Sequence, residues 1–124
     1  TSAHHCIHEE NPLPLAVFEQ GCIFRRYATE RLAQQGRQAR IAYTSVSVAG
    51  IYAALDAGLA CSVLLRSNVR PGLRILNEAE GFPRLPDIGV TLQRSPLAAG
   101  RLIDRLEQHM LDAFSTGPAF ALAA

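Results

Sequence analysis

Short apolar runs alternate with helical patterns between residues 13 and 65, and this alternation constrains the fold more than any other feature of the chain. The apolar runs are bounded by Gly, Pro, Ser or Thr, which is typical of buried strands. The stretches between them carry apolar residues at helical spacing, which predicts amphipathic helices. Strands are expected at 13–18, 40–44 and 60–65, and helices at 22–35 and 48–57. This order predicts an α/β fold, in which a mainly parallel sheet lies between two helical layers.

The second half of the chain is less regular. The expected elements are a short strand at 73–76, an irregular loop at 78–87, a half-exposed strand at 88–93, a helix at 96–114 and a loose tail at 119–124. The strand at 88–93 rests on alternating apolar and polar residues. Ser95 and Pro96 suit the first positions of the helix. In the first strand, Pro14 is expected at the first position, because Pro cannot donate a hydrogen bond within a central ladder.

Composition and charge exclude several classes of protein. Apolar residues make up 48% of the 124 residues, which is enough for a packed core. The net charge is +1, so the excess of positive charge typical of a nucleic-acid-binding surface is missing. No apolar run is long enough to cross a membrane, and no signal-peptide pattern precedes the first strand.

The cysteine content favours a reducing environment. Cys6, Cys22 and Cys61 are odd in number and form no Cys-x-x-Cys pair. A disulfide framework is therefore not expected, and a cytoplasmic location is predicted. The chain begins at Thr1 rather than Met, which suggests a piece of a longer protein.

Two polar corners form the candidate binding site. Each follows a predicted strand and opens a helix, and the carboxyl ends of parallel strands meet where ligands bind in open α/β sheets. Free backbone N–H groups at the two helix starts favour an anion such as a carboxylate. The candidate binding residues are Phe18, Gln20, Gly21, Cys22, Thr44, Ser45, Val46 and Ser47. The residues alone leave a second interpretation open, in which Ser45 and Ser47 are only helix caps and Phe18 only core.

Four segments carry a recognisable pattern in their order and spacing. They are Pro14-Leu-Ala-Val-Phe-Glu-Gln-Gly-Cys-Ile-Phe-Arg-Arg, Thr44-Ser-Val-Ser-Val-Ala-Gly50, Ala57-Gly-Leu59 with Val63-Leu-Leu65, and Ser95-Pro-Leu-Ala-Ala-Gly-Arg-Leu-Ile-Asp-Arg-Leu106. Together they resemble the effector-binding domain of LysR-type transcriptional regulators, over nearly the whole chain. The resemblance implies a fold similar to type 2 periplasmic binding proteins, with two α/β lobes around a ligand cleft.

The resemblance also implies how the chain is divided. Residues 1–12 would form a hinge connector, 13–87 the second lobe, 88–114 a return strand and helix of the first lobe, and 115–124 a loose tail. Most of the first lobe and the DNA-binding helix-turn-helix domain have no counterpart in this sequence. The chain would therefore supply half of an effector pocket, and the whole protein would bind DNA only through the absent domain.

A function follows from the resemblance. It implies that the matching corners contact a small effector, expected to bear a carboxylate, without altering it. It also implies a homodimer or homotetramer whose arrangement the effector changes. The alternative of another class is a lobe of a periplasmic solute-binding protein that serves transport.

Other chemistry is less well supported by the sequence. Cys22 at a helix start could be a redox-active thiol, but the next cysteine lies in a predicted buried strand, so a small turn residue is favoured. His4, His5, Cys6 and His8 are metal-ligand types, yet no second ligand pair follows, and a solvated connector is favoured. No catalytic or cofactor-binding motif is present, so neither enzyme activity nor a cofactor is expected. Arg66, after the third strand, is a weaker site candidate.

Overall fold

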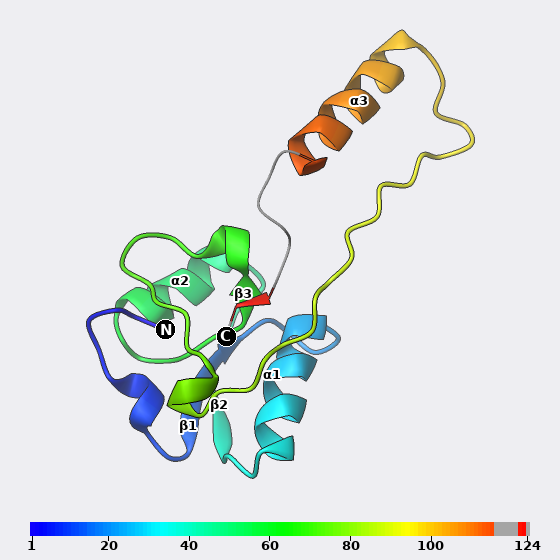
Figure 1. Cartoon of the computed structure of the whole chain (residues 1–124). Coiled ribbons are helices and arrows are strands. Elements are labelled where there is room, and N and C mark those ends of the chain that lie inside the picture. Colours follow the sequence, from blue (N-terminus) through cyan, green and yellow to red (C-terminus); the bar gives the residue numbers. More distant parts are fainter. Residues whose placement is uncertain (116–121, 124) are drawn as a thin grey trace.

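The computed structural model describes residues 1–115 and 122–123. Its helices and strands are β1 (Leu13–Val17), α1 (Ile23–Gln34), β2 (Ala39–Thr44), α2 (Val48–Asp56), β3 (Leu64–Leu65), α3 (Arg101–Ser115) and β4 (Leu122–Ala123). This part of the chain also has short 3-10 helices at Ile7–Glu9, Arg66–Asn68 and Glu78–Glu80. Figure 1 shows α3 standing apart from the other elements, at the end of a long extended segment.

Strand β1 pairs on both sides, with β2 in a two-stranded sheet and with Cys61 through a single bridge. It runs parallel to β2 along its whole length. On its other side a parallel bridge joins Leu15 to Cys61, and the amide of Ala16 donates a 2.8 Å hydrogen bond to the Cys61 carbonyl. All five residues of β1 are buried, as expected for an apolar strand between two neighbours.

The side chains of β1 alternate between two hydrophobic cores. On one face, Leu13, Leu15 and Val17 pack with Ala28 and Leu32 of α1. On the other face, Ala16 packs with Ile51, Ala54 and Leu55 of α2. The two helices therefore cover opposite faces of the strand, and the fold has helix, strand and helix in three local layers. Each fully buried Leu or Ile in these cores contributes about 1.5–3 kcal/mol through the hydrophobic effect.

Local sequence patterns predicted the first four elements well. The strands expected at 13–18 and 40–44 and the helices expected at 22–35 and 48–57 are confirmed, each within one residue at either end. Strand β2 differs in one respect, since it is largely exposed, with Ile41 and Tyr43 each more than two-fifths accessible. An edge strand with only one neighbour accounts for this exposure.

Pro14 lies at the second position of β1, so its expected place at the first position was wrong. Its carbonyl accepts a 2.9 Å hydrogen bond from the Cys61 amide. The next donor on that side of the strand is Ala16, whose amide completes the bridge between Leu15 and Cys61. No donor is needed at Pro14 because the neighbouring segment does not extend alongside it.

Three predicted strands were wrong in extent or existence. The run at 60–65 forms a bridge at Cys61 and the two residues of β3, and β3 pairs antiparallel with β4. The run at 73–76 forms only one bridge, between Leu73 and Ser2. Within the described residues, 88–93 forms no strand despite its alternating pattern. An alternating pattern gives a segment one apolar and one polar face. A strand also needs a neighbouring backbone that completes its hydrogen bonds.

The helix expected at 96–114 begins five residues later, at Arg101. The Ser95 hydroxyl accepts a 3.3 Å hydrogen bond from the Leu97 amide, and the Ala98 amide donates to the Ser95 carbonyl at 2.9 Å. These bonds close a local turn. Gly100 then adopts a φ of 110°, which a helical residue cannot have. Ser95 therefore begins a turn instead of capping α3.

Described residues at both ends of the chain pair with the rest of the fold. The segment expected as a connector is attached to the body, because the Ala3 amide donates to the Gly72 carbonyl and the Arg74 amide donates to the Thr1 carbonyl, both at 2.9 Å. Of the tail expected to be loose, Leu122–Ala123 forms β4, and the remaining residues, 116–121 and 124, lie outside the described part of the chain.

Candidate functional site

The first corner is a tight turn between β1 and α1. Gly21 has a φ of 92°, in the left-handed region that favours glycine. The Cys22 amide donates a 3.2 Å hydrogen bond to the Glu19 carbonyl, and Cys22 then occupies the N-cap position of α1. Its side chain makes no capping hydrogen bond. The first turn of α1 therefore keeps free backbone N–H groups that could donate hydrogen bonds to an anion.

An open groove of about 550 Å³ lies at this first corner. It is lined by Gln20, Gly21, Cys22, Ile23, Arg25, Arg26 and Thr29. The Arg25 guanidinium donates a 3.3 Å hydrogen bond to the Phe18 carbonyl, which holds a positive charge beside the start of the helix. Arg26 forms a long contact of 4.0 Å with Glu30, and both side chains are more than half exposed.

The candidate residues chosen from the sequence do not include Arg25 and Arg26, although both line the groove. Their distance from Cys22 in the sequence could have predicted this position, since residues three and four positions apart share one face of a helix. Thr29 continues the same face, and its hydroxyl donates to the Arg25 carbonyl at 3.1 Å.

Phe18, predicted as an apolar wall of the site, is half-buried at the end of β1. Its ring packs against Phe24 of α1 with centroids 6.1 Å apart and a tilt of 54°. It also packs against the core formed by Ala16 and α2. Phe18 thus anchors the corner, and packing alone is sufficient to explain its identity.

The second corner is built by hydrogen bonds between Ser45, Ser47 and Gly50. The Ser45 hydroxyl donates to the Ser47 carbonyl at 3.0 Å and accepts from the Ser47 amide at 3.1 Å. The Ser47 hydroxyl accepts a 3.2 Å bond from the Gly50 amide and so caps α2. A Cβ on Gly50 would lie 2.3 Å from the Ser45 hydroxyl, so only glycine fits beside this turn.

The two corners are brought together at the same edge of the sheet. The Ser45 amide donates a 3.0 Å hydrogen bond to the Val17 carbonyl, the residue before Phe18. The hydroxyls of Ser45 and Ser47 are both used within the corner, but only Ser47 caps α2. Thr44 is exposed, and its hydroxyl has no hydrogen-bond partner among the described residues. Val46 is 78% exposed. Thr44 is therefore the hydroxyl most available to a ligand.

The three cysteines are free thiols in different environments. Cys6 is exposed, Cys22 is half-buried and Cys61 is buried beside β1. Burial raises the pKa of the Cys61 thiol, which disfavours the reactive thiolate.

The His-rich segment near the start does not converge on one point. His8 is buried, and its ring nitrogen Nε2 lies 2.7 Å from the Arg74 guanidinium. The His5 ring lies against Gly58 and its Nδ1 is 3.1 Å from the Ser2 hydroxyl. Among the described residues, no group of three His, Cys, Asp or Glu side chains is arranged to hold a metal ion. Nor does any helix in this part of the chain have the length and apolar character needed to cross a membrane.

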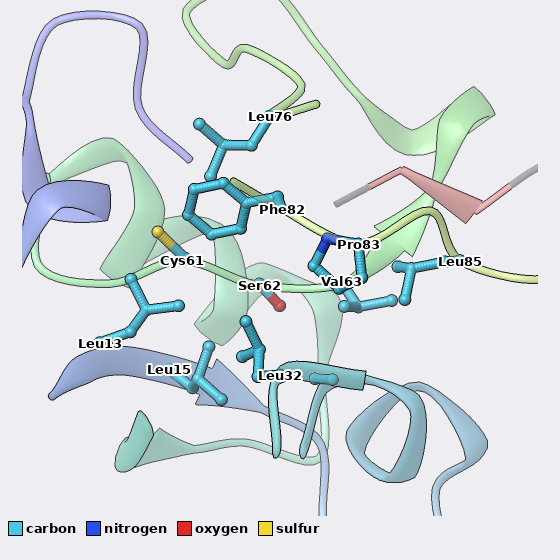
Figure 2. A pocket seen from close by; sticks show the side chains of 11 residues that line it. Leu13, Leu15, Leu32, Cys61, Ser62, Val63, Leu76, Phe82, Pro83 and Leu85 are labelled. Carbon is cyan, nitrogen blue, oxygen red and sulfur yellow. The ribbon is translucent and has the colours of Figure 1, made fainter. Parts of the chain in front are cut away.

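A small, partly open cavity lined by core residues is distinct from both corners (Figure 2). It measures about 30 Å³ and is lined mostly by apolar side chains from β1, α1, residues 61–63 and the 76–85 segment. The hydroxyl of Ser62 is buried in its wall and has no hydrogen-bond partner among the described residues. The cavity has room for about one water molecule, so it cannot hold a metabolite.

Comparison with known proteins gives two relatives of the same kind. The chain is 32% identical over 100 residues to the HTH-type transcriptional regulator DgdR of Burkholderia cepacia, a match that covers 81% of this chain and 34% of that protein. It is 35% identical over 82 residues to the HTH-type transcriptional regulator PecT of Dickeya dadantii (strain 3937), covering 66% of this chain and 26% of that protein. No family model matches the chain.

These relatives confirm the coarser part of the prediction, a relationship to transcriptional regulators. Both relatives are transcriptional regulators and not enzymes, in agreement with the expectation of a chain without catalytic function, and neither supports the transport alternative. The chain spans about a third or less of the length of the curated relatives it matches.

Proposed function

We propose that this chain is the C-terminal portion of an effector-binding domain in a LysR-type transcriptional regulator. Residues 13–87 would form the second of two lobes similar to those of periplasmic binding proteins, and the two corners at the edge of β1 and β2 would form one wall of the ligand cleft. The observation that carries the proposal is the hydrogen bond from the Ser45 amide to the Val17 carbonyl, which fixes both corners at one edge. The relationship to two regulators supports the same function.

The chemistry of the wall favours a small carboxylate as the effector. The start of α1 offers backbone N–H groups, and Arg25 and Arg26 add positive charge beside them. Thr44 offers a hydroxyl that both donates and accepts hydrogen bonds. The ligand would be bound and released unchanged, because these groups include no nucleophile paired with a base.

The whole protein would act as a cytoplasmic homodimer or homotetramer. Its effector would shift the equilibrium between arrangements of the subunits, and DNA would be bound by a helix-turn-helix domain outside this chain. A helix-turn-helix encoded upstream in the same gene is the expected result, and a secretory signal at that place would contradict the regulator.

The pocket can be tested in the full-length protein with a panel of small carboxylates and a thermal-shift assay. A carboxylate that raises the melting temperature is then titrated against the double variant Thr44→Val with Ser45→Ala, and against Arg25→Gln. Loss of either the hydroxyls or the charge should weaken binding about tenfold, the effect of one charge-assisted hydrogen bond. Arg31→Gln, on the same helix as Arg25 but outside the groove, is the matched control. Equal affinity in all four proteins would remove the corners from the site.

A further inference from the structure

A second groove lies away from the two corners, between the end of β3 and the 75–85 segment. It measures about 310 Å³ and shares no residue with the groove at the first corner. Two arginines, Arg66 and Arg84, line it together with Asn77 and Glu78. Beneath these polar residues lie the buried side chains of Leu76, Phe82 and Leu85. The groove therefore combines a charged rim with an apolar floor.

The arginines of this groove differ from most others in the chain. Eight of the 12 Arg side chains engage an oxygen, a ring nitrogen or an acidic partner. The four without such a partner among the described residues are Arg66, Arg84, Arg101 and Arg105. The last two lie on α3 and line no groove described for this chain. Among the described residues, Arg66 and Arg84 are thus two arginines without such a partner that line the same groove.

The rim and floor define the kind of ligand that fits. A guanidinium group is planar and presents paired donors that match a carboxylate. Glu78 stands on the same rim, so a ligand with two negative charges would meet repulsion that a single carboxylate avoids. The volume is at the small end of the range for ligand sites, and the floor suits an apolar group.

The residues that form the floor of the groove also form a wall of the small cavity shown in Figure 2. Leu76, Phe82, Pro83 and Leu85 line both spaces, and Figure 2 shows these side chains around the cavity. A well-packed wall resists displacement, whereas a wall with empty space behind it can move inward at low cost. The cavity of about 30 Å³ gives this wall such room.

We propose that this groove is a second ligand site, which binds a small monocarboxylate with an apolar body. The carboxylate lies between Arg66 and Arg84, and the apolar body rests on Phe82 and Leu85. The site is separate from the proposed effector wall, since it contains none of the corner residues. A failure of the proposed function would therefore not contradict this second site.

The test is a titration of the 124-residue chain with phenylacetate, followed by the backbone NMR signals of residues around the groove. Phenylacetate should shift the signals of Phe82 and Leu85, while the neutral phenylacetamide should not. Arg66→Gln and Arg84→Gln should each weaken binding about tenfold, as expected for the loss of one charge-assisted pair. Arg101→Gln and Arg105→Gln remove equally unpaired arginines outside the groove and should leave the affinity unchanged. Arg84→Lys keeps the charge but loses the planar donors, so it should give an intermediate affinity.

Three results would overturn the inference. The first is the absence of groove shifts at millimolar phenylacetate. The second is equal binding of phenylacetamide, which would show that the carboxylate is not recognised. The third is binding that disappears in Thr44→Val with Ser45→Ala but persists in both groove variants, because the ligand would then occupy the proposed effector wall. A folded state in each variant is checked by its dispersed NMR spectrum.

Discussion

The backbone amide of Ser45 donates a 3.0 Å hydrogen bond to the carbonyl oxygen of Val17. This bond extends the pairing of β1 with β2 by one residue beyond the end of β2 at Thr44. The paired strand ends therefore fix the distance between the turns that lead into α1 and α2. Ser45 also holds the start of α2 through its hydroxyl, so a single residue connects the sheet edge with the second corner.

Replacing Gly50 should disturb this connection. In most helices Gly→Ala stabilises the fold by up to about 1 kcal/mol. At Gly50 the added methyl group would lie 2.3 Å from Ser45 Oγ and 2.9 Å from Ser45 Cβ. We therefore expect Gly50→Ala to lower the free energy of unfolding by about 1–3 kcal/mol, as overpacking does. Urea denaturation measures the change.

A double-mutant cycle isolates the cause of that effect. Ser45→Gly removes both atoms that the new methyl group would meet, so Gly50→Ala should cost less in that background. Ala53→Gly, at an exposed position of α2, controls for helix propensity and should destabilise by about 1 kcal/mol. Additive effects of the two corner changes would show that the contact with Ser45 is not responsible.

The two helix starts should respond differently to changes at the N-cap. Ser47 caps α2 through its hydroxyl, so Ser47→Ala should destabilise the protein by about 1 kcal/mol. Cys22 makes no capping bond at the start of α1, although its backbone is extended as an N-cap requires. Cys22→Asp should therefore stabilise by about 0.5–1 kcal/mol. Thermal unfolding monitored by circular dichroism compares both variants with Cys6→Ser, an exposed control. Equal destabilisation by both cap changes would contradict the assigned roles.

The contrast between the first 60 residues and the later part shows what local pattern can predict. Strands β1 and β2 and helices α1 and α2 were predictable because spacing and turn residues specify them locally. The segment 88–93 has an equally clear period, yet it is not a strand, because no neighbouring backbone pairs with it among the described residues. Pairing partners are distant in sequence, and a period of two gives no information about them.

Some features of the candidate site could likewise be predicted from the sequence, and others could not. The place of Gly21, Cys22, Thr44 and Ser45 at one sheet edge followed from strand order. The cap that Ser47 provides was also expected, whereas the bonds of the Ser45 hydroxyl to Ser47 close a turn and cap no helix. The groove between Arg66 and Arg84 was not predictable, since it depends on how the 75–85 segment folds back onto the core. That path is set by the packing of Phe82 and Leu85 rather than by a local motif.

The thiols should react in the order of their exposure. A thiol reagent under native conditions should modify Cys6 first and Cys22 more slowly. Cys61 should react only when the core opens, because it is buried and its pKa is raised by burial. For a domain stable by about 5 kcal/mol, opening limits the rate by roughly a thousandfold or more. Mass spectrometry after proteolysis assigns each site. Native labelling of Cys61 as fast as that of Cys22 would contradict the buried position.

Glu80 should make part of the protein's stability depend on pH. Its carboxylate accepts a hydrogen bond from the Arg74 guanidinium, which lowers the pKa of Glu80 below its usual value of 4.5. It also accepts a 3.2 Å bond from the Asn77 amide in a capping box. A carboxyl group whose pKa is lower in the folded state stabilises the protein above its unfolded pKa, and this contribution is lost as the pH falls through the folded pKa.

We therefore expect acidification below about pH 4.5 to lower the free energy of unfolding, in part through Glu80. Glu80→Gln should be less stable than the parent at pH 7, and the difference between the two proteins should shrink at lower pH. Glu78→Gln, in the same short helix, is the matched control, because Glu78 has no ion-pair partner among the described residues. Denaturation in urea at several pH values gives the comparison. A difference between Glu80→Gln and the parent that stays constant with pH would show that the carboxylate charge does not stabilise this segment.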